Sequence, residues 1–569
     1  MEMKNQWVIK PTPRTETIQL LMDEVKLPLP LAVVLAQRGI NSFESAKTFF
    51  RPDLKNLHDP FLLKDMDKAV ERIVSAVQNG ENILVYGDYD VDGTTAVALM
   101  YDFLKSFYPN VSYYIPDRYT EGYGISFQGI DYAEDNGFSL IIALDCGIKA
   151  VDKIAYANEK NIDFIICDHH LPGETLPEAI AVLDPKRTDC LYPFKELSGC
   201  GVGFKLTQAL TQKLGLENSG AEKYLDLLVV SIAADIVPII GENRIMAFYG
   251  MNKMQKSPRP GLKSLLGEKQ RDKLNISNIV FSIAPRINAT GRLEHASQSV
   301  ELLIAEEAEK ISAFTSQINN LNDQRKETDG NVTAEAIEMI RKNNEEERFT
   351  TVVFDPNWHK GVLGIVASRL IETFYRPTLV LTAGNEGEIT GSARSVKDFD
   401  IYEIIDQCSD LLTKYGGHRF AAGLTMPMEN FEAFKEKFEQ LVKEKIRPIQ
   451  RKPSLEIDTE IRFSEITPYF LKVLSQMEPF GPENMTPLFL TKDLIGGNIK
   501  EMGKNGEHLR LSLIDEASRI KMPAVAFNMG EFSKDFQYRR FDAVYSIDEN
   551  HWKGNTYLQL NLRDVRFKD

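Results

Sequence analysis

Tyr86-Gly87-Asp88-Tyr89-Asp90-Val91-Asp92-Gly93-Thr94-Thr95 is the stretch that decides the fold of this chain. It follows the short apolar run Ile83–Val85, which is typical of a buried β-strand, and it precedes Ala96–Met100, which continues as a helix. Three carboxylates at alternate positions therefore crowd a strand-to-helix turn, where like charges repel unless a cation lies among them. A divalent metal explains this pattern. On this segment alone, a solvated acidic turn punctuated by Gly87 and Gly93 is the alternative.

Further apolar runs follow the opening turn at intervals that suit strands separated by helices. They are Val111–Ile115, Leu140–Leu144, Phe164–Cys167 and Ile180–Leu183. Runs that are apolar on both faces indicate a parallel sheet covered by helices. The last three of these runs are followed directly by acidic residues, namely Asp145, Asp168 and Asp184. Because ligands lie beyond the carboxyl ends of strands in open α/β sheets, we expect these acids to converge with the opening turn, although Asp at a strand end is also a common turn residue.

Two more features point to the same place. His169 and His170 follow Asp168 directly, and Asp235 ends the apolar helical stretch 224–235. A carboxylate behind so apolar a stretch is costly to bury unless it is paired or coordinated. We therefore add Asp235 to the candidate site.

The chain divides into five parts by pattern. Residues 1–60 form a small helical segment, residues 61–298 hold the first α/β unit, and a long helical pattern with an apolar stripe every seven residues makes 299–345 a connecting helix. Residues 346–445 form a second α/β unit, and the short strands within 454–569 indicate an antiparallel barrel of the OB type. An ordinary β-sandwich that binds a protein is the alternative for this last part.

Composition sets outer limits on function. The chain has 569 residues, of which 43% are hydrophobic and 26% charged, which is ordinary for several globular domains. Its five cysteines form no CxxC pair, no apolar run approaches a membrane span, and the start has no apolar signal core, so we expect a soluble cytoplasmic protein. A net charge of −15 argues against an obligate nucleic-acid coat protein, but only a local basic track has to meet phosphates.

Four short segments identify a family resemblance when they are taken in order: Gly87–Gly93, Leu144–Gly147, Asp168–His170 and Ala233–Asp235. Together they resemble the DHH phosphoesterase superfamily. The Gly-rich turn Gly416–Gly423 resembles the associated DHHA1 domain. Three further segments narrow the resemblance to the RecJ family of single-stranded-DNA exonucleases; they are Ser198–Gly203, the predicted arginine loop Ala284–Arg292, and His359–Ala367. The implied fold is α/β, with DHH and DHHA1 domains joined by a long helix and followed by an OB-like β-barrel.

The metal chemistry follows from the donor set. Carboxylate oxygens with one or two imidazoles and no thiolate suit Mn²⁺ or Mg²⁺ better than zinc. Two such ions are expected, held by five ligands of which Asp145 is the expected bridge: Asp90, Asp92, Asp145, His169 and Asp235. Asp88 and Asp168 are either ligands or acceptors that orient their neighbours. His170 is assigned to the scissile phosphate, with a structural histidine as the alternative.

Substrate capture is expected from arginine, histidine and small polar residues of both α/β units. The candidates are Arg118, Arg286, Asn288, Arg292, His359, Ser392, Arg394 and His418. Several of them could form an anion pocket for a terminal phosphate, and any one of the arginines could instead make a surface ion pair. On the barrel, tyrosines, arginines and Trp552 are candidates for stacking against bases.

The leading hypothesis is a metal-dependent 5′ to 3′ exonuclease that hydrolyses single-stranded DNA to 5′ mononucleotides in DNA repair and recombination. Its polarity comes from the resemblance alone, which also implies single-strand-binding protein and a helicase as candidate partners of a monomer. A nanoRNA or cyclic-dinucleotide phosphodiesterase, or a pyrophosphatase, of the same superfamily is the second hypothesis. A non-catalytic strand-binding protein with vestigial acids is the third.

Overall fold

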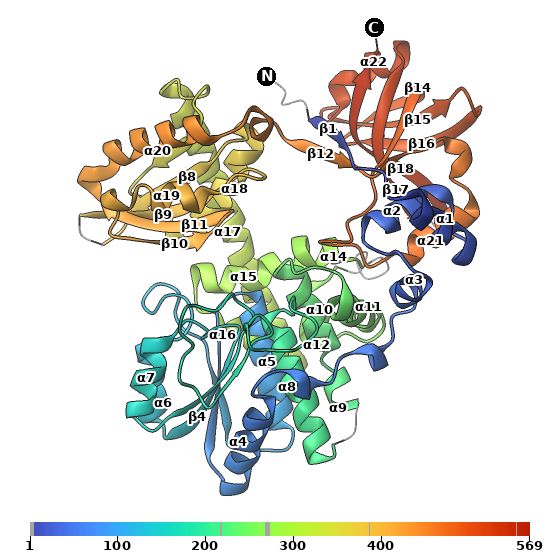
Figure 1. Cartoon of the computed structure of the whole chain (residues 1–569). Helices are drawn as coiled ribbons and strands as arrows, with labels where there is room; N and C mark the ends of the chain where they lie inside the picture. Colours follow the sequence, from blue (N-terminus) through green and yellow to red (C-terminus); the bar gives the residue numbers. More distant parts are fainter. Residues whose placement is uncertain (1–4, 217–218, 268–273, 386, 553–554, 569) are drawn as a thin grey trace.

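The computed structural model describes residues 5–216, 219–267, 274–385, 387–552 and 555–568. Figure 1 shows three bodies. An α/β unit in blue to green lies at the bottom, a second α/β unit in yellow to orange lies at the upper left, and a barrel in red lies at the upper right. In the described part of the chain no helix is long and apolar enough to span a bilayer.

The first α/β unit is built on a five-stranded parallel sheet with strand order β3-β2-β4-β5-β6. Its strands span β2 (Asn82–Gly87), β3 (Val111–Tyr114), β4 (Phe138–Leu144), β5 (Asp163–Cys167) and β6 (Ala181–Leu183). Apart from residues at their starts and the half-buried end of β3, they are buried, as the two-sided apolar runs predict. The carboxyl ends of β2, β4 and β5 pair side by side, which brings the acids behind them to one edge.

Helices of this unit cover the sheet and carry the remaining site residues. They include α4 (Met66–Asn79), α5 (Val91–Lys105), α8 (Gly199–Leu214), α10 (Leu225–Ala234) and α11 (Gly241–Lys256). The start of α4 buries Met66, Ala69, Val70 and Ile73, and the helix ends at Gly80, whose φ of 71° favours glycine. Helices α5, α8 and α10 contact one another, so the turns at their ends are held by one core.

The long helical pattern is two helices rather than one. Helix α16 (Ser297–Ile304) ends where Ala305 turns extended, and α17 (Ala308–Lys342) begins after it. In Figure 1 α17 runs from the first α/β unit into the second. Gly330 lies inside α17 without breaking it.

The second α/β unit has a mixed sheet with strand order β10-β11-β9-β8-β7. Its strands are β7 (Thr351–Phe354), β8 (Thr378–Ala383), β9 (Glu388–Arg394), β10 (Lys414–His418) and β11 (Ala421–Pro427), and only β7 and β8 pair in parallel. The predicted Gly-rich turn Gly416–Gly423 is wrong for most of its residues, because they form the end of β10 and the start of β11. Ser392 lies opposite Gly423, which lies opposite Gly416, so glycines leave one face of the sheet bare beside Ser392.

The C-terminal body is a closed barrel, which confirms the predicted architecture over the sandwich. Five strands close through the β14–β17 pairing: β14 (Phe489–Met502), β15 (His508–Asp515), β16 (Ile520–Ala526), β18 (Asn555–Phe567) and β17 (Phe541–Trp552). Helices α1 (Thr15–Glu24), α2 (Leu29–Gln37), α3 (Phe43–Phe50) and α21 (Pro468–Gln476) share its core. The helical N-terminal segment therefore packs on the barrel, although the two lie at opposite ends of the sequence.

A two-stranded parallel ribbon joins the start of the chain to the segment that enters the barrel. Strand β1 (Gln6–Ile9) pairs with β12 (Ser454–Ile457). The Trp7 indole N–H donates to Asp564 Oδ2 at 2.8 Å, and the Arg566 guanidinium lies 4.1 Å above the Trp7 ring. Lys397 of the second α/β unit forms an ion pair with Glu456, so the ribbon contacts both upper bodies.

Candidate metal centre and anion pocket

The acidic turn between β2 and α5 is stabilised by one of its own carboxylates. Asp90 is the N-cap of α5, and its Oδ1 accepts the Gly93 N–H at 3.0 Å. A Cβ on Gly93 would lie 2.4 Å from the carbonyl oxygen of Asp88, so only glycine fits this approach. The turn therefore orders its acids through backbone contacts before any ligand is considered.

Asp92 is held by the first turn of α8 and by Ser231 near the C-terminal end of α10. Its Oδ2 accepts the Gly199 N–H at 2.7 Å, and its Oδ1 accepts the Cys200 N–H at 2.8 Å and the Ser231 hydroxyl at 2.7 Å. The positive end of the α8 dipole thus faces this carboxylate. A Cβ on Gly199 would lie 2.5 Å from Asp145 Oδ1, which explains glycine at this position.

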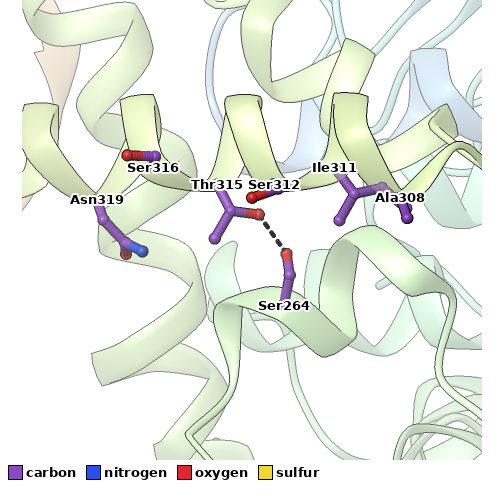
Figure 2. A pocket seen from close by; sticks show the side chains of 7 residues that line it. All are labelled: Ser264, Ala308, Ile311, Ser312, Thr315, Ser316 and Asn319. Atoms are coloured by element: carbon purple, nitrogen blue, oxygen red, sulfur yellow. Dashed lines mark hydrogen bonds between the residues drawn. The ribbon is translucent and has the colours of Figure 1, made fainter.

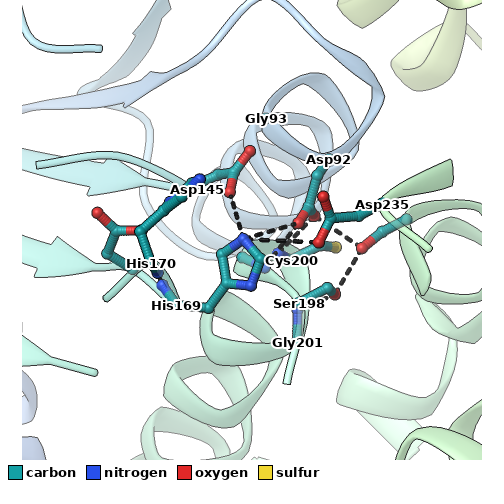
Figure 3. Close-up of polar contacts among 12 residues, drawn as sticks. Asp92, Gly93, Asp145, His169, His170, Ser198, Cys200, Gly201 and Asp235 are labelled. Carbon is teal, nitrogen blue, oxygen red and sulfur yellow. Dashed lines mark hydrogen bonds and ion pairs between the residues drawn. The ribbon is translucent and has the colours of Figure 1, made fainter. Parts of the chain in front are cut away.

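His169 lies at the centre of the acidic cluster (Figure 3). Its Nε2 is 3.2 Å from Asp145 Oδ1, 3.6 Å from Asp235 Oδ2 and 3.9 Å from Asp92 Oδ2. Two groups of three side chains bring possible ligand atoms within 4.8 Å of one another: Asp92 with His169 and Asp235, and Asp145 with His169 and His170. The structure therefore joins four of the five predicted ligands, drawn from segments far apart in sequence.

The polar atoms of this cluster fit a bound cation. Asp145 Oδ1 and both ring nitrogens of His169 are buried and make no hydrogen bond. Burial raises the pKa of Asp145 well above its ordinary value, and repulsion from Asp92 and Asp90 adds to the shift. Burial also raises the pKa of Asp235 to about 8, again with Asp92 and Asp90 contributing. A divalent ion would coordinate these unpartnered ligand atoms and would neutralise the crowded carboxylates.

Asp88 and Asp90 lie outside both three-residue groups. Neither side-chain oxygen of the buried Asp88 makes a hydrogen bond, and burial followed by repulsion from Asp90 raises its pKa well above the ordinary value. Asp90 uses Oδ1 for its cap. Burial followed by repulsion from Asp92 raises the pKa of Asp90 as well.

Asp168 contacts and orients His170. Its Oδ1 accepts the backbone N–H groups of His169 and His170 and contacts His170 Nδ1 at 2.7 Å, while Oδ2 accepts the Ile148 N–H. Burial alone would raise the pKa of Asp168 and lower that of His170. Their mutual hydrogen bond and ion pair outweigh burial and hold the two pKa values at about 2 and about 9. The Nε2 of His170 lies 3.2 Å from the hydroxyl of Tyr123, which sequence reasoning missed.

A cavity of about 280 Å³ lies between the two α/β units. Four predicted residues line it, namely Arg118, Arg292, Ser392 and Arg394, together with Tyr89, Tyr119 and Lys360. Burial lowers the pKa of Arg292 to about 10, and the neighbouring arginines add to that shift. Such mutual repulsion among cations is relieved by a bound anion, so the cavity has the charge of a phosphate pocket.

Hydrogen bonds and a cation–π contact fix these cations, and one of the hydrogen bonds crosses the domain boundary. Arg292 Nη1 donates to the Gly361 carbonyl at 2.9 Å, and the Tyr119 hydroxyl donates to the Arg292 carbonyl. Arg118 lies 4.8 Å from the centroid of the Tyr89 ring, and Arg394 Nη1 donates to Ser392 Oγ at 2.9 Å. Tyr119 and Lys360 were not among the predicted binding residues, because the pocket forms only where the two α/β units meet.

Four predicted substrate residues lie outside this lining. Arg286 donates to Asn319 Oδ1 at 2.8 Å, and the predicted arginine loop is wrong because Ala284–Leu293 is helix α15. Asn288 is half-buried on α15. His359 accepts the Gly361 N–H beside the pocket, and His418 is exposed on β10, whereas the side chain of Trp552 lies outside the described residues.

A larger cavity lies elsewhere and carries no such chemistry. It measures about 610 Å³, lies between α12 (Pro260–Leu265) and α17, and includes Ser264 and Thr315, whose hydroxyls are 2.6 Å apart (Figure 2). Its lining holds no ionisable side chain. The metal cluster and the arginine pocket are therefore the candidate functional site.

Comparison with protein families gives three matches along the chain. Residues 82–232 match the DHH family N-terminal domain, residues 346–444 the DHHA1 domain, and residues 457–564 the RecJ OB domain. The three matches fall on the three bodies of the fold.

Relatives with these domains span the chain. It is 34% identical to the single-stranded-DNA-specific exonuclease RecJ of Bacillus subtilis, over 99% of this chain and 71% of that protein. It is 31% identical to RecJ of Salmonella typhimurium, over 99% of this chain and 100% of that protein. A crystal structure of RecJ in complex with Mn²⁺ from Thermus thermophilus superposes with a TM-score of 0.84 at 26% identity, covering 100% of this chain and 80% of that chain. A Mg²⁺ complex from the same organism gives 0.78 at 25% identity, covering 99% and 79%.

Proposed function

The chain belongs to the RecJ family of single-stranded-DNA-specific exonucleases, and from this premise we propose that it removes 5′ mononucleotides from the 5′ end of single-stranded DNA. The observation that carries the proposal is one loop that serves both halves of the site. Arg118 and Tyr119 line the anion pocket, and Tyr123 of the same loop contacts His170 of the metal centre. A strand whose terminal phosphate occupies the pocket would thus present its next phosphodiester to the metal centre.

Asp92, Asp145, His169 and Asp235 would hold one or two divalent ions, and Asp90 would complete the set for a second. Their donor chemistry suits Mn²⁺ or Mg²⁺, the ions found in the Thermus thermophilus RecJ complexes. Ions held there would supply Lewis-acid activation of water and would neutralise charge on the phosphoryl oxygens.

The chain's own residues have three tasks in this scheme. His170, held protonated by Asp168, donates a hydrogen bond to the scissile phosphate. Arg118, Arg292 and Arg394 hold the terminal phosphate with charge-assisted hydrogen bonds. The first α/β unit alone would suit a short dinucleotide, so we assign the barrel to binding the rest of a long strand. We place this activity in DNA repair and recombination.

The test uses a long 5′-phosphorylated strand labelled at one end and then at the other, with and without Mn²⁺. The 5′ label should leave first, as a mononucleotide, and only with metal. Arg394→Ala should lower kcat/KM roughly 10- to 100-fold, since hydrogen bonds to a charged group contribute about 1.5–3 kcal/mol. Arg341→Ala, at an exposed arginine in the last turn of α17 and outside the pocket, is the matched control and should match the parent enzyme. Earlier release of the 3′ label, or products of mixed length, would contradict the proposal.

A further inference from the structure

Ile236 follows Asp235 directly and has an unusual backbone. Helix α10 ends at Ala234, Asp235 is its C-cap, and Ile236 takes φ 59° in the left-handed region. This position beyond a helix end favours glycine, and it is unfavourable for a β-branched residue. The side chain gains no burial in return, because it is 65% exposed. The fold itself therefore does not explain why isoleucine stands here.

The segment that contains Ile236 runs from the metal centre to the barrel. Asp235 lies beside His169, and four residues later the Ile239 N–H donates to the Pro482 carbonyl at 2.8 Å. A Cβ on Gly481 would lie 2.5 Å from the Ile239 side chain, so the two segments pack closely. The arginine pocket is built instead from the other α/β unit, Tyr89 of the opening turn, residues 118–119 and Arg292 of α15.

These positions fix where a bound strand must go. With its terminal phosphate among the arginines and its next phosphodiester at the metal centre, the strand leaves on the side of Asp235, toward the barrel. Ile236 is an exposed apolar side chain on that side, and it directly follows Asp235 of the metal centre. A nucleobase covers apolar surface well and does so without regard to sequence.

We propose that Ile236 is an apolar contact for the nucleoside on the barrel side of the scissile phosphate. The inference rests on the proposed function and adds a binding residue to it. The strained backbone keeps the side chain in the path of the strand, where it supports the base as the phosphodiester is aligned.

The experiment compares two 5′-phosphorylated strands, one intact and one abasic at the nucleoside 3′ of the first scissile phosphate. In Ile236→Gly, the ratio of kcat/KM for the intact strand over the abasic strand should fall about ten-fold. Ile236→Val should restore the ratio, because it keeps a β-branched apolar side chain. The melting temperature of Ile236→Gly should rise, since glycine removes the backbone strain.

Each alternative has its own signature in this experiment. If Ile236 only positions Asp235, Ile236→Gly lowers kcat/KM equally for both strands and the ratio stays, which would overturn the inference. Asn344→Gly is the matched control, because Asn344 takes φ 53° one residue beyond the C-cap of α17, away from the site. It should leave both the ratio and the rates at parent values. Failure of the parent enzyme to cut the intact strand with Mn²⁺ would instead contradict the proposed function.

Discussion

At the scale of single residues, the metal centre depends on glycine as much as on acids. Gly199 heads α8, where its N–H binds Asp92 while its Cα passes Asp145. Gly199→Ala would place a methyl group 2.5 Å from Asp145 Oδ1, and one of the two must move. Because displaced ligand supports typically cost 10- to 100-fold in metal affinity, we expect a loss of that size in Mn²⁺ binding by titration calorimetry.

Gly201→Ala is the matched control two residues along the same helix. Its Cβ would meet Ser198 Oγ at 3.3 Å and Leu197 Cβ at 3.4 Å, distances that a small shift accommodates. Mn²⁺ affinity should then stay near the parent value. Equal affinities for Gly199→Ala and the parent would show that Asp145 is not a ligand.

Asp184 gives a prediction for stability against pH. It is fully buried, its Oδ2 makes no hydrogen bond, and burial raises its pKa to about 7. The folded state therefore holds this proton more tightly than the unfolded chain does, so stability falls as pH rises from about 4 through 7. Three pKa units correspond to a cost on the order of 4 kcal/mol above pH 7. Asp184→Asn should raise the melting temperature at pH 8 and change it little near pH 4.

Asp53→Asn serves as control for this substitution. Asp53 accepts the Lys55 N–H just as Asp184 accepts the Lys186 N–H, but Asp53 is exposed. Its replacement should leave the melting temperature unchanged at both pH values. A pH-independent effect at Asp184 would mean that its carboxylate is not the source of the cost.

The charged residues of the site could be predicted from sequence because titratable side chains just behind apolar strands and helices have few structural explanations. Asp145, His169 and Asp235 are of this kind. The supports could not be predicted: Ser231 and Tyr123 are ordinary residues whose value comes from contacts between distant segments. Asp184 shows the same limit of local sequence patterns: it follows a strand as Asp145 and Asp168 do, but it lies outside both groups of possible metal ligands.

At the scale of elements, α15 shows how glycine and proline mislead. Pro285 and Gly291 made its segment resemble a loop, yet proline is favoured in the first turn of a helix. Gly291 is required by packing, since a Cβ there would lie 2.8 Å from the Tyr89 carbonyl oxygen. Proline and glycine in a sequence therefore do not decide between a loop and a helix until the packing of the neighbouring elements is known.

Gly330 in α17 differs from Gly291, because packing does not require a glycine there. A Cβ on it would meet no atom within 4 Å, and its backbone is helical. Gly330→Ala should therefore stabilise the connecting helix by about 1 kcal/mol, measured by chemical denaturation. Gly80→Ala is the paired control: its Cβ is equally unhindered, but φ 71° makes alanine unfavourable there and stability should fall. A loss of stability in both variants would contradict the helical geometry at Gly330.

At the scale of the whole molecule, the β1–β12 ribbon joins bodies that the chain order keeps apart. Local patterns predicted the two α/β units and the barrel, because each has its own apolar periodicity. They could not predict a pairing between Gln6 and Ser454, since each strand has only four residues and no local partner. The described part of the chain gives β12 no other strand than β1.

The ribbon should therefore depend on Trp7. Its hydrogen bond to Asp564 and its contact with Arg566 together contribute about 2 kcal/mol at a half-buried site. Trp7→Ala should make opening of the ribbon about 30-fold more frequent, because each 1.4 kcal/mol is a factor of ten. Trypsin would then cut after Arg451 faster by a similar factor, provided that opening precedes cleavage. Trp7→Phe keeps the ring under Arg566 and should give an intermediate rate, and an unchanged rate in Trp7→Ala would mean that the β1–β12 backbone hydrogen bonds hold the ribbon without the side chain.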